Sequence, residues 1–173
     1  DALKGLDRII AVSTDMKRKM IEEYNIQEEK IVVIHNGVDL IKFPYMEKYK
    51  ARQFLELPIN ERFGVCVARL SPEKNLDIMM KAISLMGDNA PKIYIIGDGP
   101  LKNQLRSDLM QCGLIGKIHL IGSAPHDEIY KWLNAADFFC LPSEREGCPV
   151  VVHEALACGL PVISTTVGAI PDL

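Results

Sequence analysis

Short apolar runs rich in β-branched residues recur along the chain, and longer amphipathic stretches separate them. Each run is apolar throughout rather than alternating between apolar and polar residues, which is typical of parallel strands covered on both faces. The runs predict strands at Arg8–Val12, Ile31–Ile34, Phe63–Val67, Lys92–Ile96, Lys117–Ile121, Asp137–Leu141 and Pro161–Ser164.

The stretches between the runs carry apolar residues at helical spacing. In one of them, Leu76, Met79, Met80 and Ile83 fall on one face. The predicted helices lie at Asp15–Tyr24, Asn75–Met86, Pro100–Gln111, His126–Ala135 and Pro149–Cys158. Alternating strands and helices predict an α/β fold with a doubly wound, mostly parallel sheet and helices on both faces.

The alternation is interrupted once, by a polar and irregular region with two prolines between Asn36–Gly37 and Glu61. We therefore predict that the first strand and helix belong to a different unit from the main sheet, which is expected to start near Ile31. The sequence stops at Leu173, just after a predicted strand and a loop, so we expect it to be part of a longer protein.

Composition narrows the class of protein. The chain has 173 residues, of which 48% are hydrophobic and 25% charged, and this is typical of a globular protein. A net charge of −3 without a basic stripe argues against a nucleic-acid partner. No apolar stretch approaches the roughly 18 residues that span a bilayer, and Asp1 begins no signal peptide, so we expect a cytoplasmic protein without a transmembrane segment.

Neither cysteine nor histidine spacing indicates a metal site. The five cysteines form no Cys-x-x-Cys pair, which favours reduced, buried thiols. The four histidines are scattered along the chain at spacings that make no metal site.

The loops that follow the strands are the candidates for chemistry, because ligands of open parallel sheets bind beyond the carboxyl ends of the strands. Ser71 can cap a helix that begins at Pro72, which places Arg69 at a strand end and Lys74 in the first helical turn. Since the helix dipole disfavours a cation there, an anionic partner such as a diphosphate would stabilise the arrangement. Ion pairs with Glu73 or Asp77 explain the same spacing equally well.

Two glycines follow the strand that ends at Ile96. Gly97 and Gly99 allow a tight turn and the close approach of a ligand. The dinucleotide-binding fingerprint is incomplete, because Lys102 stands where its third glycine belongs, so the indication for NAD is weak. A tight turn from strand to helix explains these residues as well.

A carboxylate pair follows the strand at Asp137–Leu141. Glu146 lies in the loop, and Glu154 stands eight residues later inside a helix whose flanks are apolar. A carboxylate in such a helix rarely lacks a partner. If the loop folds over the helix N-terminus, both carboxylates and the free N–H groups of Gly147 to Val150 face one cleft. Carboxylates suit sugar hydroxyls and N–H groups suit phosphate, which is the order of groups in a nucleotide-sugar.

Several short motifs follow one another in order over residues 8–168. They are Ile10-Ala11-Val12-Ser13, Ile34-His35-Asn36-Gly37-Val38-Asp39, Ala68-Arg69-Leu70 with Lys74-Asn75, Ile96-Gly97-Asp98-Gly99-Pro100, and Glu146 with Glu154-Ala155, Ala157, Gly159 and Pro161-Val162. This set resembles the donor-binding domain of the retaining GT-B glycosyltransferases, the group 1 class of family 4. The resemblance implies a Rossmann-like half of a GT-B fold. It also implies sugar transfer from a nucleoside-diphosphate-sugar with retention at the anomeric carbon, without a metal or other cofactor.

The resemblance implies roles for the matched positions. Arg69 and Lys74 would bind the diphosphate of the sugar donor and stabilise its charge as the glycosidic bond breaks. Glu146 would bind hydroxyls of the transferred sugar and is counted with those two as catalytic, whereas Glu154 would bind the ribose diol. Further positions expected at the sugar donor are Gly97, Gly99, Gly122, Ser123, Ala124, Gly147, Cys148, Pro149, Val150 and Val151.

The family pattern also assigns domains. Residues 1–30 would be the remnant of an N-terminal acceptor domain with a linker helix, and residues 31–173 a donor-binding domain that is incomplete at its C-terminus. The acceptor, whether a glycan, a lipid-linked molecule or a small molecule, would bind mainly to the missing domain. The chain is therefore expected to be inactive alone, and peripheral association with the inner face of a membrane is compatible with this family.

One segment departs from the family pattern, and two other classes of protein are alternatives to a glycosyltransferase. The Gly-Gly-x-Pro-Glu segment appears as Gly168-Ala169-Ile170-Pro171-Asp172, which lacks the second glycine and the glutamate. A non-catalytic nucleotide-binding module on the same fold and an NAD-dependent dehydrogenase are the alternatives. The joint presence of two cations and two carboxylates in the loops favours the transferase.

Overall fold

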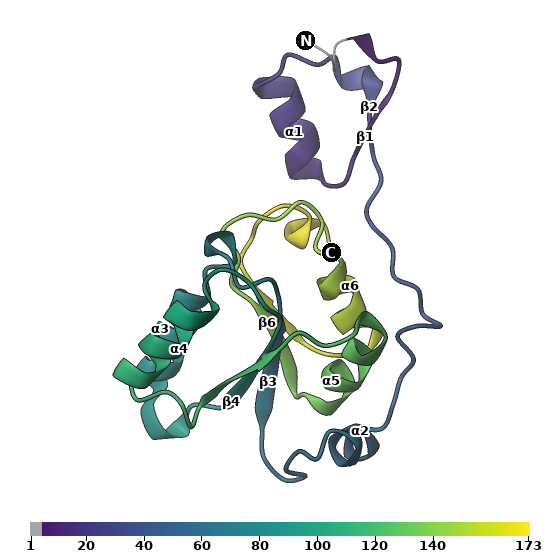
Figure 1. The fold of residues 1–173 in the computed structure, drawn as a ribbon. Helices are drawn as coiled ribbons and strands as arrows, with labels where there is room; N and C mark the ends of the chain where they lie inside the picture. The colour runs from purple at the N-terminus through teal and green to yellow at the C-terminus, as the bar shows by residue number, and fades with distance from the viewer. Residues whose placement is uncertain (1–4) are drawn as a thin grey trace.

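Five parallel strands form the main sheet of the protein, in the spatial order β5-β4-β3-β6-β7 (Figure 1). The computed structural model describes residues 5–173. The strands are β3 (Phe63–Val67), β4 (Lys92–Ile96), β5 (Ile118–Gly122), β6 (Phe138–Leu141) and β7 (Val162–Ser164). The chain runs outward from the central strand β3 through β4 to β5, then returns to the other side of β3. The predicted doubly wound parallel sheet is confirmed.

Helices cover both faces of this sheet, as predicted. In Figure 1, α3 (Leu76–Met86) and α4 (Lys102–Gln111) lie on one side, and α5 (Ile129–Ala135) and α6 (Val150–Ala157) on the other. Consecutive residues of β4 point into two separate cores, since Ile93 and Ile95 pack with the first pair of helices and Tyr94 and Ile96 with the second. Burial on both faces explains why the strands are continuous apolar runs.

A small separate unit precedes the main sheet. It contains β1 (Ile9–Ala11), α1 (Thr14–Glu22) and β2 (Ile31–Val33), and β1 pairs in parallel with β2. The expectation that the main sheet starts near Ile31 is therefore wrong, because the main sheet starts at Phe63. Apolar residues of the small unit form a core of their own, and this places β2 beside β1. The division into domains at 1–30 and 31–173 stays a prediction.

The region expected to be irregular contains a helix, α2 (Lys48–Phe54). Its Arg52 is buried and donates from Nε to the carbonyl of Ala135 at 2.8 Å and from its guanidinium to Asp137 at 3.0 Å. The guanidinium also lies over the ring of Phe63, 4.6 Å from its centroid. Packing against the end of α5, rather than a helical pattern of apolar residues, holds this helix in place.

Acid should weaken the fold through Asp137. Its carboxylate accepts hydrogen bonds from Lys48 at 2.7 Å and from the N–H of Phe63 at 2.9 Å, as well as from Arg52. Burial raises the pKa of Asp137, but these donors outweigh it and lower the pKa below 3.8. A carboxyl with a lowered pKa in the folded state stabilises the fold above its unfolded pKa, and this contribution is lost as the pH falls through the folded pKa.

We expect the urea midpoint of the wild-type protein to fall as the pH drops below about 4, the ordinary pKa of an aspartate. The fall should be smaller in Asp137→Asn. Asp88→Asn is the matched control, because the carboxylate of Asp88 makes no hydrogen bond or ion pair within residues 5–173. Equal falls in Asp137→Asn and the wild type would show that another group causes the acid sensitivity.

The cysteines are all free, and four of the five are buried. Burial raises the pKa of Cys140 to about 12 and that of Cys158 to about 11. Cys112, at the end of α4, is exposed and corrects the expectation that the thiols are buried. The thiol of Cys112 is therefore accessible to chemical labels.

Candidate functional site

The loops after β3 and β6 meet at the carboxyl end of the sheet and bring two candidate residues together. Lys74 Nζ lies 2.7 Å from Glu146 Oε1, and the hydroxyl of Ser143 donates to the same oxygen at 2.6 Å. The two charged side chains are only 20% and 9% exposed. Lys74 and Glu146 therefore form a shielded ion pair at the edge where ligands of such sheets bind.

The local structure around Lys74 differs from the prediction. Pro72–Lys74 is a short 3-10 turn, Asn75 has a left-handed backbone with φ +53°, and α3 begins only at Leu76. The Ser71 hydroxyl donates to the carboxylate of Glu73 at 2.6 Å and does not cap the helix. Lys74 therefore lies outside the first turn of α3. Its partner in the structure comes from the β6–α6 loop and is neither Glu73 nor Asp77.

Arg69 and the two glycines that follow β4 lie in loops at the same edge of the sheet. Arg69 is exposed, and its side chain makes no hydrogen bond or ion pair within the described chain. A Cβ atom on Gly97 would lie 1.9 Å from the carbonyl oxygen of Ala68, and one on Gly99 would lie 2.5 Å from that of Leu70. The glycines thus allow the loops after β3 and β4 to pack backbone against backbone, as expected of a tight turn.

The N-terminus of α6 offers unpaired backbone donors. The helix begins at Val150, one residue later than predicted, with Pro149 in the cap position and no side-chain cap. Within residues 5–173, the N–H groups of Gly147, Cys148, Val150 and Val151 have no hydrogen-bond acceptor. Such a helix start attracts anions, because free N–H groups and the helix dipole act together.

Glu154 has the partner that its apolar surroundings led us to expect. The residue is 3% exposed, and its Oε1 lies 2.9 Å from Nε2 of His126 in the turn η5 (His126–Glu128). The preceding loop is adjacent to the end of β4, since the N–H of Gly97 donates to the carbonyl of Gly122 at 2.8 Å. In that loop, Ser123 is exposed and Ala124 packs partly against the core.

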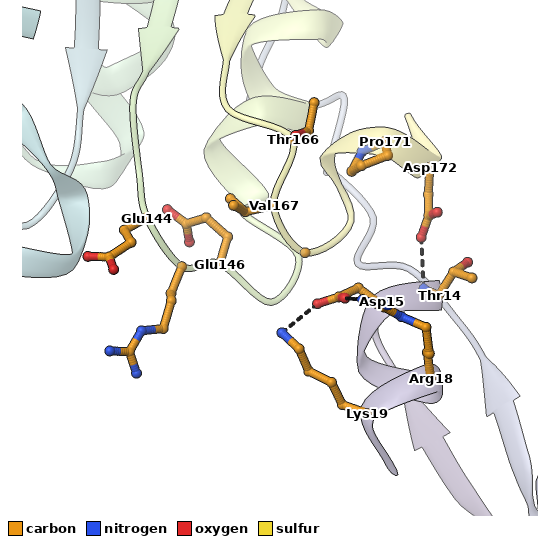
Figure 2. Close-up of a pocket in the computed structure, with 12 residues that line it drawn as sticks. Thr14, Asp15, Arg18, Lys19, Glu144, Glu146, Thr166, Val167, Pro171 and Asp172 are labelled. Carbon is orange, nitrogen blue, oxygen red and sulfur yellow. Dashed lines mark hydrogen bonds and ion pairs between the residues drawn. The ribbon is translucent and has the colours of Figure 1, made fainter. Parts of the chain in front are cut away.

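Glu146 lines a cavity to which Glu154 does not contribute. A cavity of about 530 Å³ lies between α1, the β6–α6 loop and the segment after β7, and Glu154 is not among its lining residues. Figure 2 shows the residues that line it. The residues that line it are Thr14, Asp15, Arg18, Lys19, Glu144, Arg145, Glu146, Thr166, Val167, Gly168, Pro171 and Asp172. A single cleft that holds both Glu146 and Glu154 stays a prediction.

Sequence reasoning missed the contribution of α1 to this cavity. Asp15 accepts from Arg18 at 2.6 Å and from Lys19 at 2.7 Å, so one carboxylate pairs with two cations (Figure 2). The amphipathic pattern of α1 indicated a helix, but it carried no information about the loops that the helix would face.

The described residues hold no cluster of three or more histidine, cysteine or acidic side chains suited to a metal ion, and metal independence stays a prediction. None of the helices in residues 5–173 has the length and apolar character needed to cross a membrane.

Solved structures with the same fold are known. The fold superposes on sucrose-phosphate synthase from Thermosynechococcus elongatus with a TM-score of 0.84 and 22% identity, covering 96% of this chain and 42% of that one. It also matches Anabaena HepE, solved in complex with UDP and glucose, with a TM-score of 0.79 and 24% identity over 96% of this chain and 46% of that one. The protein has the Rossmann-like α/β fold of the GT-B glycosyltransferases.

Sequence comparison identifies the family. Residues 47–173 match the family described as "Glycosyl transferases group 1", and residues 1–42 match "Glycosyltransferase Family 4". The chain is 32% identical over 175 aligned residues to a D-inositol 3-phosphate glycosyltransferase of Thermobispora bispora, covering 95% of this chain and 41% of that relative. The chain belongs to the group 1 glycosyltransferase family, and it spans less than half the length of this relative.

Proposed function

We propose that this chain is the donor-binding part of an enzyme that transfers a sugar from a nucleoside-diphosphate-sugar to an acceptor, with retention at the anomeric carbon. The observation that carries the proposal is the shielded Lys74–Glu146 pair beside the free N–H groups of α6. The structural similarity to HepE, which was solved with UDP and glucose, supports the choice of ligand.

Lys74 and Arg69 bind the diphosphate and stabilise the negative charge that develops on it as the glycosidic bond breaks. The N–H groups at the start of α6 add to this stabilisation. When Lys74 turns to phosphate, Glu146 is released from its ion pair and accepts hydrogen bonds from hydroxyls of the transferred sugar. Diphosphate binding would therefore exchange the Glu146 partner of Lys74 for phosphate. No metal or other cofactor takes part in the proposed reaction.

Glu154 binds the ribose diol, because a buried carboxylate can accept from two neighbouring hydroxyls. The loop that contains Gly122, Ser123 and Ala124 faces the base, with Gly97 and Gly99 beside it. The acceptor binds mainly to residues outside this chain, so the chain alone does not complete the transfer. We place the reaction in the cytoplasm or at the inner face of a membrane.

Glu154→Gln tests the position of the ribose. We expect about 10-fold weaker UDP binding and unchanged pyrophosphate binding, because hydrogen bonds to a charged group contribute about 1.5–3 kcal/mol and pyrophosphate has no ribose. Thermal shifts with UDP, GDP, ADP, their sugar conjugates and pyrophosphate measure this, since a ligand at about 100 times its Kd adds about 2.7 kcal/mol of stability.

Glu22→Gln, which changes an exposed carboxylate on α1, is the control and should bind both ligands like the wild type. Equal losses of UDP and pyrophosphate in Glu154→Gln would overturn the ribose assignment. If no nucleoside diphosphate shifts the wild-type midpoint, the proposed function of this chain is wrong.

A further inference from the structure

The carboxylate of Asp172 joins the small N-terminal unit to the main domain. Oδ2 of Asp172 accepts from the backbone N–H of Thr14 at 2.8 Å (Figure 2). The same oxygen contacts Nε2 of His35 at 3.1 Å. Thr14 is the first residue of α1, and a carboxylate at that end of a helix is favoured by the dipole and satisfies a free N–H. The hydrogen bond from Thr14, followed by that from His35, lowers the pKa of Asp172.

The segment that carries Asp172 is attached to the loop that carries Glu146. The N–H of Ala169 donates to the carbonyl of Gly147 at 2.8 Å. Gly168 has a φ of +57°, and a Cβ atom there would lie 2.4 Å from the carbonyl oxygen of Glu146. This packing leaves no room for a side chain, so the Asp172 segment and the Glu146 loop are expected to move together.

A second link reaches the same loop from the segment that follows β2. Asn36 donates from Nδ2 to the carbonyl of Cys148 at 2.8 Å and from its backbone N to the Cys148 sulfur at 3.4 Å. Asn36 directly follows His35, the residue that contacts Asp172. The small unit is thus attached at two neighbouring points to the loop that presents Glu146.

We infer that Asp172 is a positioning residue, which holds the small N-terminal unit against the Glu146 loop and so sets the width of the cavity between them. This inference rests on the proposed function for its meaning, because the cavity borders the sugar-binding carboxylate Glu146. Asp172 acts through charge, since a carboxylate oxygen accepts from two donors more strongly than a neutral amide oxygen does. Asp172 stands where the family pattern has a glutamate. Its contacts give this aspartate a role between the two units.

A distance between spin labels tests the inference directly. One label is attached to the native exposed Cys112 on α4, and the other to Glu23→Cys at the exposed end of α1. In the wild-type background we expect one narrow distance distribution. In Asp172→Asn and Asp172→Ala the distribution should broaden at least twofold, whereas Asp172→Glu, which keeps the charge, should restore a narrow one.

Glu144→Gln is the matched control, because Glu144 lines the same cavity and its carboxylate contacts no other side chain in the described residues. It should leave the distance distribution unchanged. Asp172→Asn should also keep the UDP affinity within about twofold of the wild type, because Asp172 is not placed at the nucleotide. A distribution that stays narrow in both Asp172→Asn and Asp172→Ala would overturn the inference.

The two proposals fail in different ways. If the wild-type protein does not bind UDP, the proposed function is wrong. The distances between the spin labels would still decide the role of Asp172. An equally broad distribution in the wild type and in every variant would show that Asp172 does not hold the units together. If the thermal midpoint falls sharply in Asp172→Ala alone, that variant is unfolded and is set aside. The comparison of Asp172→Asn with Asp172→Glu then decides the role of Asp172.

Discussion

Replacing Gly97 with alanine is expected to lower the free energy of unfolding by about 4 kcal/mol, a loss of the size seen for the most damaging single substitutions. The new Cβ atom would lie 1.9 Å from the carbonyl oxygen of Ala68, and the φ of Gly97, +146°, is one that side chains rarely adopt. The clash and the backbone strain both remain, because the backbone of β4 cannot move away without breaking its pairing with β3. In a thermal melt the midpoint should fall by roughly 10 °C.

Gly113→Ala is the matched control. Gly113 also has a positive φ, +66°, but no atom lies within 4 Å of the place where its Cβ would be. The control isolates backbone strain, and we expect a loss of about 1 kcal/mol. If the two variants melted at the same temperature, the close approach between the loops after β3 and β4 would not be what requires glycine at position 97.

Replacing Lys74 with alanine is expected to weaken the binding of both UDP and pyrophosphate by about 10- to 100-fold. A hydrogen bond between a cation and phosphate contributes about 1.5–3 kcal/mol, and the Lys74 side chain is only 20% exposed, so water screens it weakly. Isothermal titration with each ligand measures the loss. Pyrophosphate distinguishes the two residues, because its affinity should fall in Lys74→Ala and stay unchanged in Glu154→Gln.

Lys81→Ala serves as the control for Lys74→Ala. Lys81 also forms an ion pair, with Asp77 at 3.0 Å, but this pair is exposed and lies on the surface of α3. The control should bind both ligands like the wild type. Unchanged pyrophosphate affinity in Lys74→Ala would mean that the Lys74–Glu146 pair is structural, and the diphosphate would then have to bind elsewhere.

The positions of the strands along the chain could be predicted from the sequence. β3 and β4 have the predicted ends, and the other strands agree within one residue at each end. Strands buried on both faces of a parallel sheet are continuous apolar runs. Such runs can be recognised in the sequence without knowing which strands pair with one another. The helix α2 was missed for the opposite reason, since its stability comes from Arg52 and its contacts with residues more than 80 positions away.

Local pattern likewise identified the candidate residues but not their partners. Lys74, Glu146 and Glu154 stood out because charges at loop ends and in apolar helices need partners. Which partners they have depends on how the loops after β3, β5 and β6 are brought to one edge of the sheet. The pairing of Glu154 with His126, and of Lys74 with Glu146, joins residues that are far apart in the chain.

The sequence by itself determined the α/β class, the positions of the strands and the residue types at the sheet edge, because each of these depends on solvent exposure and local backbone preference. Only the tertiary structure decided that β2 pairs with β1, that Lys74 meets Glu146, and that Asp172 joins the two units. These contacts form between segments separated by up to 158 positions, and no local preference of either segment specifies the other.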